Sequence, residues 1–210
     1  MADESSIPAF QPVSLQGLYV VMEPLSMGHH AALTAVADDA VFRWFPHSYA
    51  GEGPMRSFIE QALADQRAGL ALPFVVRTRH DGRVVGSTRF GSIDAAHCRA
   101  EIGWTWYAEP VQRTPVNTEC KWLLLQHAFE VLRLNRVEFK TDSLNDRSRA
   151  AIARIGATQE GIFRNHMRVQ GGRLRHSVYF SIIREEWPQV RERLQGLLSR
   201  PYTFPVSNPA

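Results

Sequence analysis

The sequence predicts a single α/β or α+β domain built on a mixed sheet. Runs rich in β-forming residues alternate along the chain with amphipathic helical runs. One pair of strands is joined by a hairpin signal, and a strand, tight turn and helix follow one another over residues 98–134. With 210 residues, of which 44% are hydrophobic and 21% charged, the chain can bury one sizeable core.

The first third of the chain predicts a strand followed by helices. Residues 1–16 hold two prolines and several small polar residues, and we expect a poorly ordered lead-in there. A short strand is expected at 18–22 and a helix at 28–36. The aromatic stretch 42–47 stops the helical pattern at a proline, and an amphipathic helix follows over 52–67.

The middle of the chain predicts three strands. Asp81-Gly82 between the runs 74–78 and 83–90 is a strong hairpin signal. The next strand begins at Cys98, and simple alternation places on one buried face the residues Cys98, Ala100, Ile102, Trp104 and Trp106.

The turn after that strand has helix-start chemistry. Thr114 is suited to the N-cap and Pro115 to the first helical position, where a missing N–H costs nothing. The helix that follows buries Trp122, Leu123, Leu125, Phe129 and Leu132. A helix start fed by a strand is a candidate anion site, because its first N–H groups lack partners within the helix.

The last third of the chain predicts a strand at 136–141, a helix at 147–155, a hairpin and a closing helix over 185–198. If Gly171-Gly172 is a two-residue turn, Met167 lies opposite His176 and Asn165 opposite Val178. We therefore expect one domain over 17–199 and a tail over 200–210.

Composition excludes several classes of protein. The net charge is only +3 and no dense basic block is present, so nucleic acid is not an expected partner. No Walker or Rossmann glycine motif occurs, and the histidines lack metal-ligand spacing, so we predict no metal. Cys98 and Cys120 are expected to be reduced thiols, and the absence of a signal peptide or an apolar membrane span favours the cytoplasm.

Several segments together resemble the GNAT superfamily of N-acetyltransferases, in particular the branch of the RimJ/RimL ribosomal-protein acetyltransferases. The resemblance is dense from residue 99 onward, and it is carried by the segments EIGW (101–104), TPVNTECK (114–121), NRVEFKTD (135–142), NDRS (145–148), IGA (155–157) and EG (160–161). It implies a mixed, mostly antiparallel sheet flanked by helices. It also implies transfer of an acetyl group from acetyl-CoA to an amine on a protein N-terminus or a small molecule, and it allows a homodimer.

The resemblance also implies where the cofactor lies. The pantetheine arm would follow the strand 99–107 and use backbone hydrogen bonds near Trp106 and Tyr107. The pyrophosphate would sit on the turn, where the candidate contacts are Gln112, Arg113, Thr114, Val116, Asn117 and Thr118. The turn departs from the family signature, because Pro115 and Asn117 stand where small residues are usual. This departure favours an alternative function, a cofactor-binding or interaction module that has kept the fold and lost efficient transfer.

Acetyl transfer needs a base for the amine and a proton for the leaving thiolate. We assign Glu101 as the base, against the alternative that it is paired with Arg99 or Arg89. The resemblance places Ser148 beside the thiol as proton donor and Asn145 as a cofactor contact. The alternative is that Ser148 and Asn145 serve only as turn and helix-start residues.

The acceptor end is the least defined part of the predicted site. Trp44, Trp104 and His166 are candidate acceptor-binding residues, although aromatic residues at such spacing are more often part of a core. His166, His176 and Tyr179 remain alternative bases.

Overall fold

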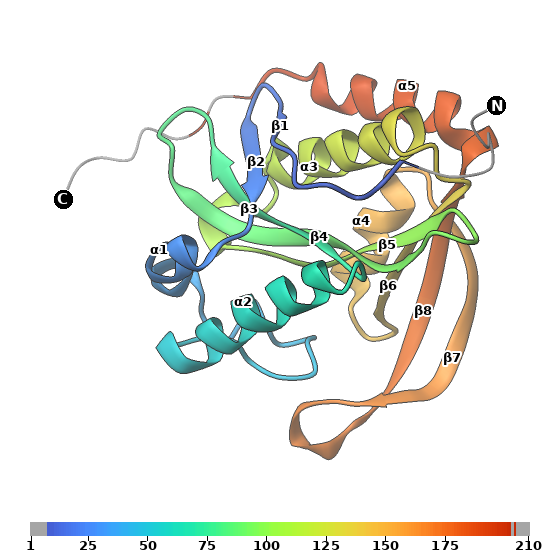
Figure 1. Cartoon of the computed structure of the whole chain (residues 1–210). Coiled ribbons are helices and arrows are strands. Elements are labelled where there is room, and N and C mark those ends of the chain that lie inside the picture. Colours follow the sequence, from blue (N-terminus) through green and yellow to red (C-terminus); the bar gives the residue numbers. More distant parts are fainter. Residues whose placement is uncertain (1–7, 203, 205–210) are drawn as a thin grey trace.

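A computed structural model describes residues 8–202 and residue 204, and within them one eight-stranded sheet lies between two layers of helices (Figure 1). The strands are β1 (Leu15–Gln16), β2 (Val20–Pro24), β3 (Leu72–Thr78), β4 (Val84–Asp94), β5 (Arg99–Tyr107), β6 (Arg136–Asp142), β7 (Thr158–Arg168) and β8 (Leu174–Ile183). The α-helices are α1 (His30–Val36), α2 (Glu52–Arg67), α3 (Pro115–Gln126), α4 (Asp146–Arg154) and α5 (Trp187–Leu198). The predicted mixed α/β class is confirmed.

The order of strands in the sheet is β1-β2-β3-β4-β5-β6-β8-β7. Every neighbouring pair is antiparallel except β5 and β6, which run parallel. That parallel pairing covers only three residue pairs, from Arg99 opposite Arg136 to Glu101 opposite Glu138. The sheet is therefore continuous at one end of β5 and open at the other.

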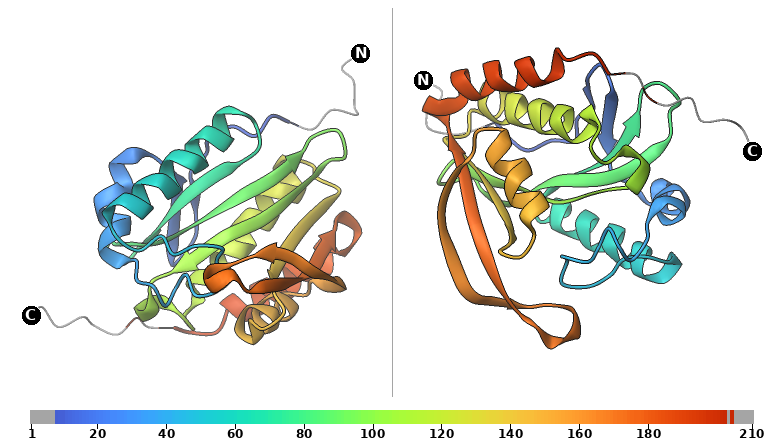
Figure 2. Two further views of the ribbon diagram at one scale, coloured as in Figure 1. Left: turned by 90° about the horizontal axis from the view of Figure 1, so that it is seen from below. Right: turned by 180° about the vertical axis from the view of Figure 1, so that it is seen from behind.

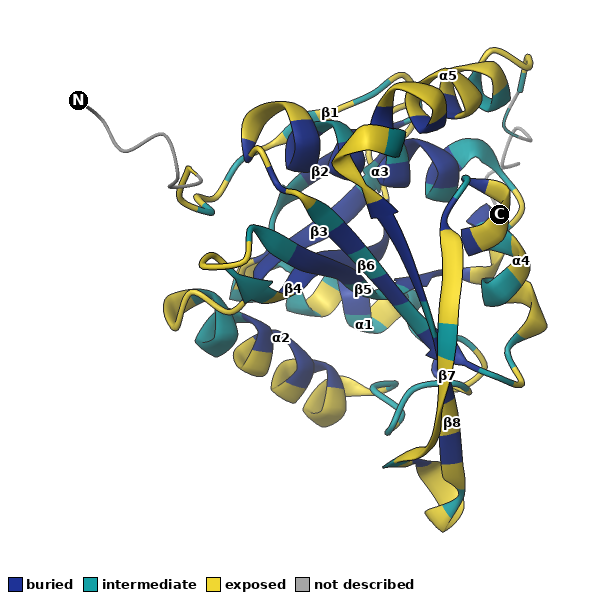
Figure 3. Cartoon of the chain, turned by 90° about the vertical axis from the view of Figure 1, so that its right-hand side faces the viewer, coloured by how far each residue is buried: buried dark blue, intermediate teal, exposed yellow. Residues whose placement is uncertain are grey.

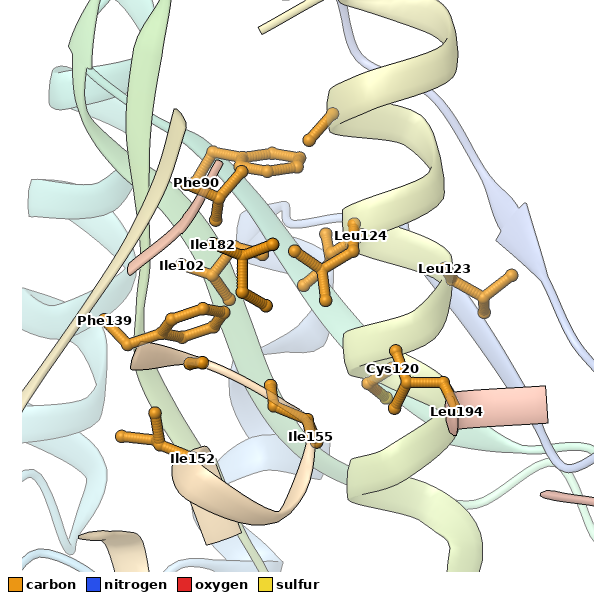
Figure 4. Close-up of a cluster of buried hydrophobic side chains, with 14 of the residues drawn as sticks. Phe90, Ile102, Cys120, Leu123, Leu124, Phe139, Ile152, Ile155, Ile182 and Leu194 are labelled. Atoms are coloured by element: carbon orange, nitrogen blue, oxygen red, sulfur yellow. The ribbon is translucent and has the colours of Figure 1, made fainter. Parts of the chain in front are cut away.

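The two faces of the sheet carry separate cores. Helices α1 and α2 cover one face, and α3, α4 and α5 cover the other (Figure 2). Figure 4 shows the larger core, in which Leu124 of α3 points toward Ile102 of β5 and Ile182 of β8, whereas Leu123 lies on another side of the helix. The Cys120 thiol is free and buried there.

The predicted elements are largely present. Residues 79–83, which include the predicted Asp81-Gly82 turn, connect β3 to β4, and α2 has the predicted bounds. Thr114 is the N-cap of α3, its hydroxyl accepting a hydrogen bond from the Val116 N–H at 3.3 Å, and Pro115 is the first helical residue. After Gln126 the helix continues as a π-helical turn, His127–Val131.

The N-terminal segment is attached to α3 by one carboxylate. Glu119 is 3% exposed, and its two oxygens accept hydrogen bonds from the N–H groups of Leu18, Tyr19 and Val20 at 2.7, 2.7 and 2.8 Å. Within the predicted lead-in, β1 pairs with β2 and the Phe10 ring packs edge-on against Phe90. Residues 1–7 and most of the predicted tail lie outside the described residues.

The predicted alternation of β5 is wrong beyond Gly103. Trp104 adopts a φ of +49°, and Trp104 and Thr105 together face the single residue Thr88 on β4. This β-bulge inserts one residue and reverses the alternation. Ala100 and Ile102 consequently pack in the core under α3, whereas Trp104 and Trp106 pack on the opposite face, toward α2.

The predicted hairpin register is also wrong. Met167 lies opposite Arg175 rather than His176, because the turn spans three residues, Gln170–Gly172, with positive φ at Gly171 and Gly172. A further irregularity lies between Phe163 and Met167, where Asn165 has a φ of +51°, so Val178 faces Ile162 and not Asn165. The long hairpin projects from the body with β7 exposed along most of its length (Figure 3).

We expect Glu119→Ala to lower the free energy of unfolding by about 3 kcal/mol, because three N–H groups lose a charged acceptor. Urea unfolding followed by circular dichroism measures the change as a shift in midpoint at constant slope. Glu60→Ala, on the exposed face of α2, is the control and should change the free energy by less than about 0.5 kcal/mol. Equal midpoints for the two variants would contradict the assigned role of Glu119.

Candidate active site

A cleft of about 1130 Å³ opens where β5 and β6 separate. Beyond Glu101 the β5 edge has no strand partner on the β6 side, and the cleft follows that edge as far as Tyr107. Its walls are the turn before α3, the start of α4, the loop 40–46 and the hairpin residues Met167 and Arg175. Free backbone groups of a strand edge are thus exposed inside a concave site.

Most of the predicted site residues meet in this cleft. Those that line it are Trp44, Glu101, Trp104, Trp106, Tyr107, Gln112, Arg113, Thr114, Asn117, Thr118, Asn145 and Ser148. Val116 and His166 do not. Val116 is fully buried in the core, and His166 lies in a separate shallow depression with Phe163, Arg164, Asn165 and His176.

Hydrogen bonds from side chains stabilise the turn before α3. In a glycine-rich turn the backbone alone would adopt the required conformation. Arg113 adopts a φ of +64°, a conformation that glycine adopts more readily. The Thr114 hydroxyl donates to the Val111 carbonyl at 2.7 Å, and the Gln112 amide donates to the Tyr107 carbonyl at 2.9 Å. Backbone hydrogen bonds to a cofactor are expected near Trp106 and Tyr107, and the carbonyl of Tyr107 already has a partner within the chain.

The turn offers fewer backbone donors than the sequence suggests. The Val116 N–H is taken by Thr114, so its predicted role as a cofactor contact is not supported in this conformation. Thr118 is the fourth helical residue, where the regular hydrogen bonds of an α-helix begin. Asn117 is left as the first-turn residue whose N–H is suited to an anion.

Arginines surround this turn. Arg113, Arg147, Arg154 and Arg200 all line the cleft, and within the described residues none of them has a carboxylate within 4.0 Å. Arg147 donates to Gln112 at 2.7 Å and Arg154 to the Thr118 hydroxyl at 2.8 Å. Three of these cations, Arg113, Arg147 and Arg154, lie in the turn or donate to it or to the first turn of α3, which makes this end of the cleft suited to a multiply charged anion.

Asn145 and Ser148 come from the start of α4. The Asn145 side chain caps the helix by accepting the Ser148 N–H at 3.1 Å, so its helix-start role is present. Both residues also face the cleft. The cap engages only the backbone N–H of Ser148. It therefore fixes the position of Ser148 on the cleft wall and does not engage the hydroxyl.

Glu101 is buried at the base of the cleft. It is 5% exposed, and its carboxylate accepts a hydrogen bond from Lys140 Nζ at 3.1 Å. The expected alternative partners are otherwise engaged, because Arg99 pairs with Asp94 and Glu138, and Arg89 pairs with Asp65. Glu101 is thus a buried carboxylate, paired with Lys140, at the point where β5 leaves β6.

Lys121 is a cleft residue that the sequence reasoning missed. It is 7% exposed, its Nζ lies 3.3 Å from the Thr105 hydroxyl and 5.2 Å from the centre of the Phe139 ring, and burial lowers its pKa to about 8. No carboxylate of the described residues lies within 4.0 Å of it. The sequence did carry a signal for this residue. Lys121 lies one helical turn after Asn117 and one turn before Leu125, which places it on the buried face of α3.

Two of the residues predicted for acceptor binding, Trp44 and Trp104, line the part of the cleft next to the loop 40–46. The Gln170 amide donates to the carbonyls of Phe42 and Phe45 at 2.9 and 3.1 Å, which fixes the tip over the loop. Trp104 lies between Arg89, 4.1 Å from its ring centre, and Lys140, 5.9 Å from it. The His166 Nδ1 is 2.9 Å from the Ser177 hydroxyl, and burial together with Lys140 and Arg175 lowers the pKa of His166.

Residues 20–158 match the family model described as "Acetyltransferase (GNAT) domain". This match covers well over half of the chain. The chain belongs to the GNAT family. The predicted resemblance, including its RimJ/RimL-like character, is confirmed by the matched family and by the relatives described next.

Among similar proteins, YdaF of Bacillus subtilis, provisionally named a ribosomal N-acetyltransferase, is 35% identical over 109 residues, which are 51% of this chain and 58% of YdaF. The chain thus matches less than two thirds of that relative. A GCN5-related N-acetyltransferase from Brucella melitensis has a TM-score of 0.85 and 30% identity, covering 95% of this chain and 91% of the other. RimJ of Mycobacterium smegmatis, solved with CoA-disulfide, has a TM-score of 0.77 and 26% identity, covering 90% and 96%.

Two features are absent from residues 8–202 and residue 204, the described part of the chain. None of their helices is long and apolar enough to cross a membrane. They contain no group of three or more His, Cys, Asp and Glu side chains placed to hold a metal ion.

We expect Lys121→Met to raise the free energy of unfolding at pH 7 by roughly 1–3 kcal/mol, because a charged amine with a lowered pKa is unfavourable when buried. Between pH 8 and 10.5 the unfolded wild-type chain binds more protons than the folded one, so its stability rises with pH. The variant lacks this rise. Urea unfolding of both proteins from pH 7 to 10.5 measures it, and parallel curves would contradict the burial of a charged Lys121.

Proposed function

We propose that this protein is an acetyl-CoA-dependent N-acetyltransferase that moves an acetyl group directly to the primary amine of a protein N-terminus, a peptide or a small molecule. One observation supports this most strongly. The open edge of β5 leads to a helix N-terminus at which three arginines, Arg113, Arg147 and Arg154, lack carboxylate partners among the described residues. The relative RimJ, solved with CoA-disulfide, adds support from outside this chain.

The residues of the cleft fit the parts of such a cosubstrate. Arg113, Arg147 and Arg154 would hold its phosphates together with the Asn117 N–H. The free β5 edge near Trp106 would hold its amide-bearing arm. Asn145 would contact the arm from the α4 side.

When bound, acetyl-CoA supplies an activated acetyl group with a thiol as leaving group. Glu101 accepts the proton that the amine loses as the new C–N bond forms. Ser148 donates a hydrogen bond or a proton to the departing thiolate. Lys121, Lys140 and Arg175 place positive charge around Glu101, and this charge lowers the pKa of an amine that enters the cleft, which favours its neutral, nucleophilic form.

A second candidate function is a module that binds acyl-CoA without efficient transfer. It is favoured by the turn before α3, where Pro115 has no N–H and Thr114 occupies the N–H of Val116. Fewer backbone donors remain for a pyrophosphate than a glycine-rich turn provides. The arginines supply positive charge, but their side chains do not reproduce the geometry of the missing backbone donors.

Two measurements separate the candidates. Isothermal titration calorimetry with acetyl-CoA should show binding at micromolar concentrations, and thiol release should follow with at least one class in a panel of amino acids, peptides and polyamines. Binding with no thiol release from any acceptor would favour the module. Absence of binding at millimolar acetyl-CoA would overturn both functions.

We expect Glu101→Gln to lower kcat by roughly 100-fold, and Ser148→Ala by roughly tenfold, because each removes one proton-transfer group. The Kd for acetyl-CoA, measured by calorimetry, should change less than about threefold in either variant. Steady-state kinetics of thiol release gives kcat.

Lys140→Met is the control for Glu101, since it breaks the same ion pair but keeps the carboxylate. It should retain more activity than Glu101→Gln. Ser143→Ala is the control for Ser148, because Ser143 lies just before α4 and does not line the cleft. If Glu101→Gln and Ser148→Ala turn over at the wild-type rate, the assigned roles are wrong.

A further inference from the structure

Arg175 of β8 is a buried cation without a carboxylate partner. It is 6% exposed, its Nε donates to the Ser177 hydroxyl at 3.1 Å and its Nη1 donates to the Trp44 carbonyl at 3.4 Å. Within the described part of the chain no carboxylate lies within 4.0 Å of its guanidinium. Burying a charge in this way is unfavourable unless a counter-charge arrives.

The neighbouring carboxylates are already engaged by other cations. Asp142, which is 1% exposed, is held by Arg173, and Glu101 is held by Lys140. Arg175 lines the cleft, and its Nη2 is the guanidinium nitrogen that no hydrogen bond within the described residues engages. The charges that line this part of the cleft are four cations, Arg43, Lys121, Lys140 and Arg175, against the single carboxylate Glu101.

The position of Arg175 assigns it to the acceptor rather than to acetyl-CoA. The arginines for the phosphates come from the turn before α3, from α4 and from the segment after α5. Arg175 comes from the hairpin, and it is fixed to the loop 40–46 through the Trp44 carbonyl and through the Gln170 contacts with Phe42 and Phe45. These elements form the opposite wall of the cleft.

A buried guanidinium that has a free N–H donor and no counter-charge is matched by a carboxylate, which supplies both the acceptor and the opposite charge. We propose that the acceptor is an amine that also carries a carboxylate, and that Arg175 binds this carboxylate while the amine faces Glu101. The proposal rests on the proposed acetyl transfer and names the acceptor class. The carboxylate belongs either to a free amino acid or to an acidic side chain near a peptide N-terminus.

The test uses matched pairs of acceptors. One member of each pair carries a carboxylate and the other carries a carboxamide at the same position. One arm compares free amino acids with their amides, and the other compares peptide amides that begin Ser-Asp or Ser-Asn. In at least one arm, the wild-type kcat/KM for thiol release should favour the carboxylate by tenfold or more. In Arg175→Met the ratio should fall to about one, and in Arg175→Lys it should fall to an intermediate value because the charge remains.

Arg168→Met is the matched control, an exposed arginine of the same hairpin that does not line the cleft, and it should keep the wild-type ratio. Calorimetry with the same pairs gives a second readout that needs no turnover. Carboxylate-selective binding by the wild type that is lost in Arg175→Met, without thiol release, would support this site and contradict the transfer function. Thiol release or binding that is equal for both members of every pair would overturn the role of Arg175.

Discussion

The short parallel pairing of β5 with β6 is the constraint on which the rest of the site depends. Three residue pairs hold the strands together as far as Glu101, and beyond that point β5 has a free edge. The bulge at Trp104 and Thr105 bends β5 there and turns two tryptophans to the α2 face. A cleft follows, with strand backbone on its floor and two helix starts, those of α3 and α4, on its wall. Glu101 lies at the point of separation because it is the last paired residue.

Charge divides this cleft into two ends. Exposed arginines gather at the start of α3, where they interact mainly with solvent and with the side chains of Gln112 and Thr118. The buried cations Lys121 and Arg175 lie nearer to Glu101, and each lacks a carboxylate of its own among the described residues. Burial makes these two charges unfavourable for stability, and the nearby carboxylates, Glu101 for both and Asp142 for Arg175, offset this only in part because each is paired with another cation. The electrostatics thus favour a bound cleft over an empty one.

Local chemistry predicted most of the fold. Thr114 and Pro115 mark the start of α3 because capping depends on neighbours in the chain, and the Asp81-Gly82 signal placed the hairpin correctly. The bulge at Trp104 and the irregularity at Asn165 were not predictable, because strand registers depend on partners far along the chain. Lys121, Arg175 and the Glu101–Lys140 pair were missed for the same reason, since each is defined by contacts between elements.

Hydrogen exchange of backbone amides, followed by mass spectrometry with and without acetyl-CoA, tests the central claim most directly. If the open β5 edge holds the cosubstrate, peptides covering 103–107 and 113–118 should exchange more slowly when acetyl-CoA is bound, because those N–H groups gain acceptors or lose contact with water. Peptides from α2 should exchange at the same rate in both states. Unchanged exchange over 103–107 at saturating acetyl-CoA would contradict the account.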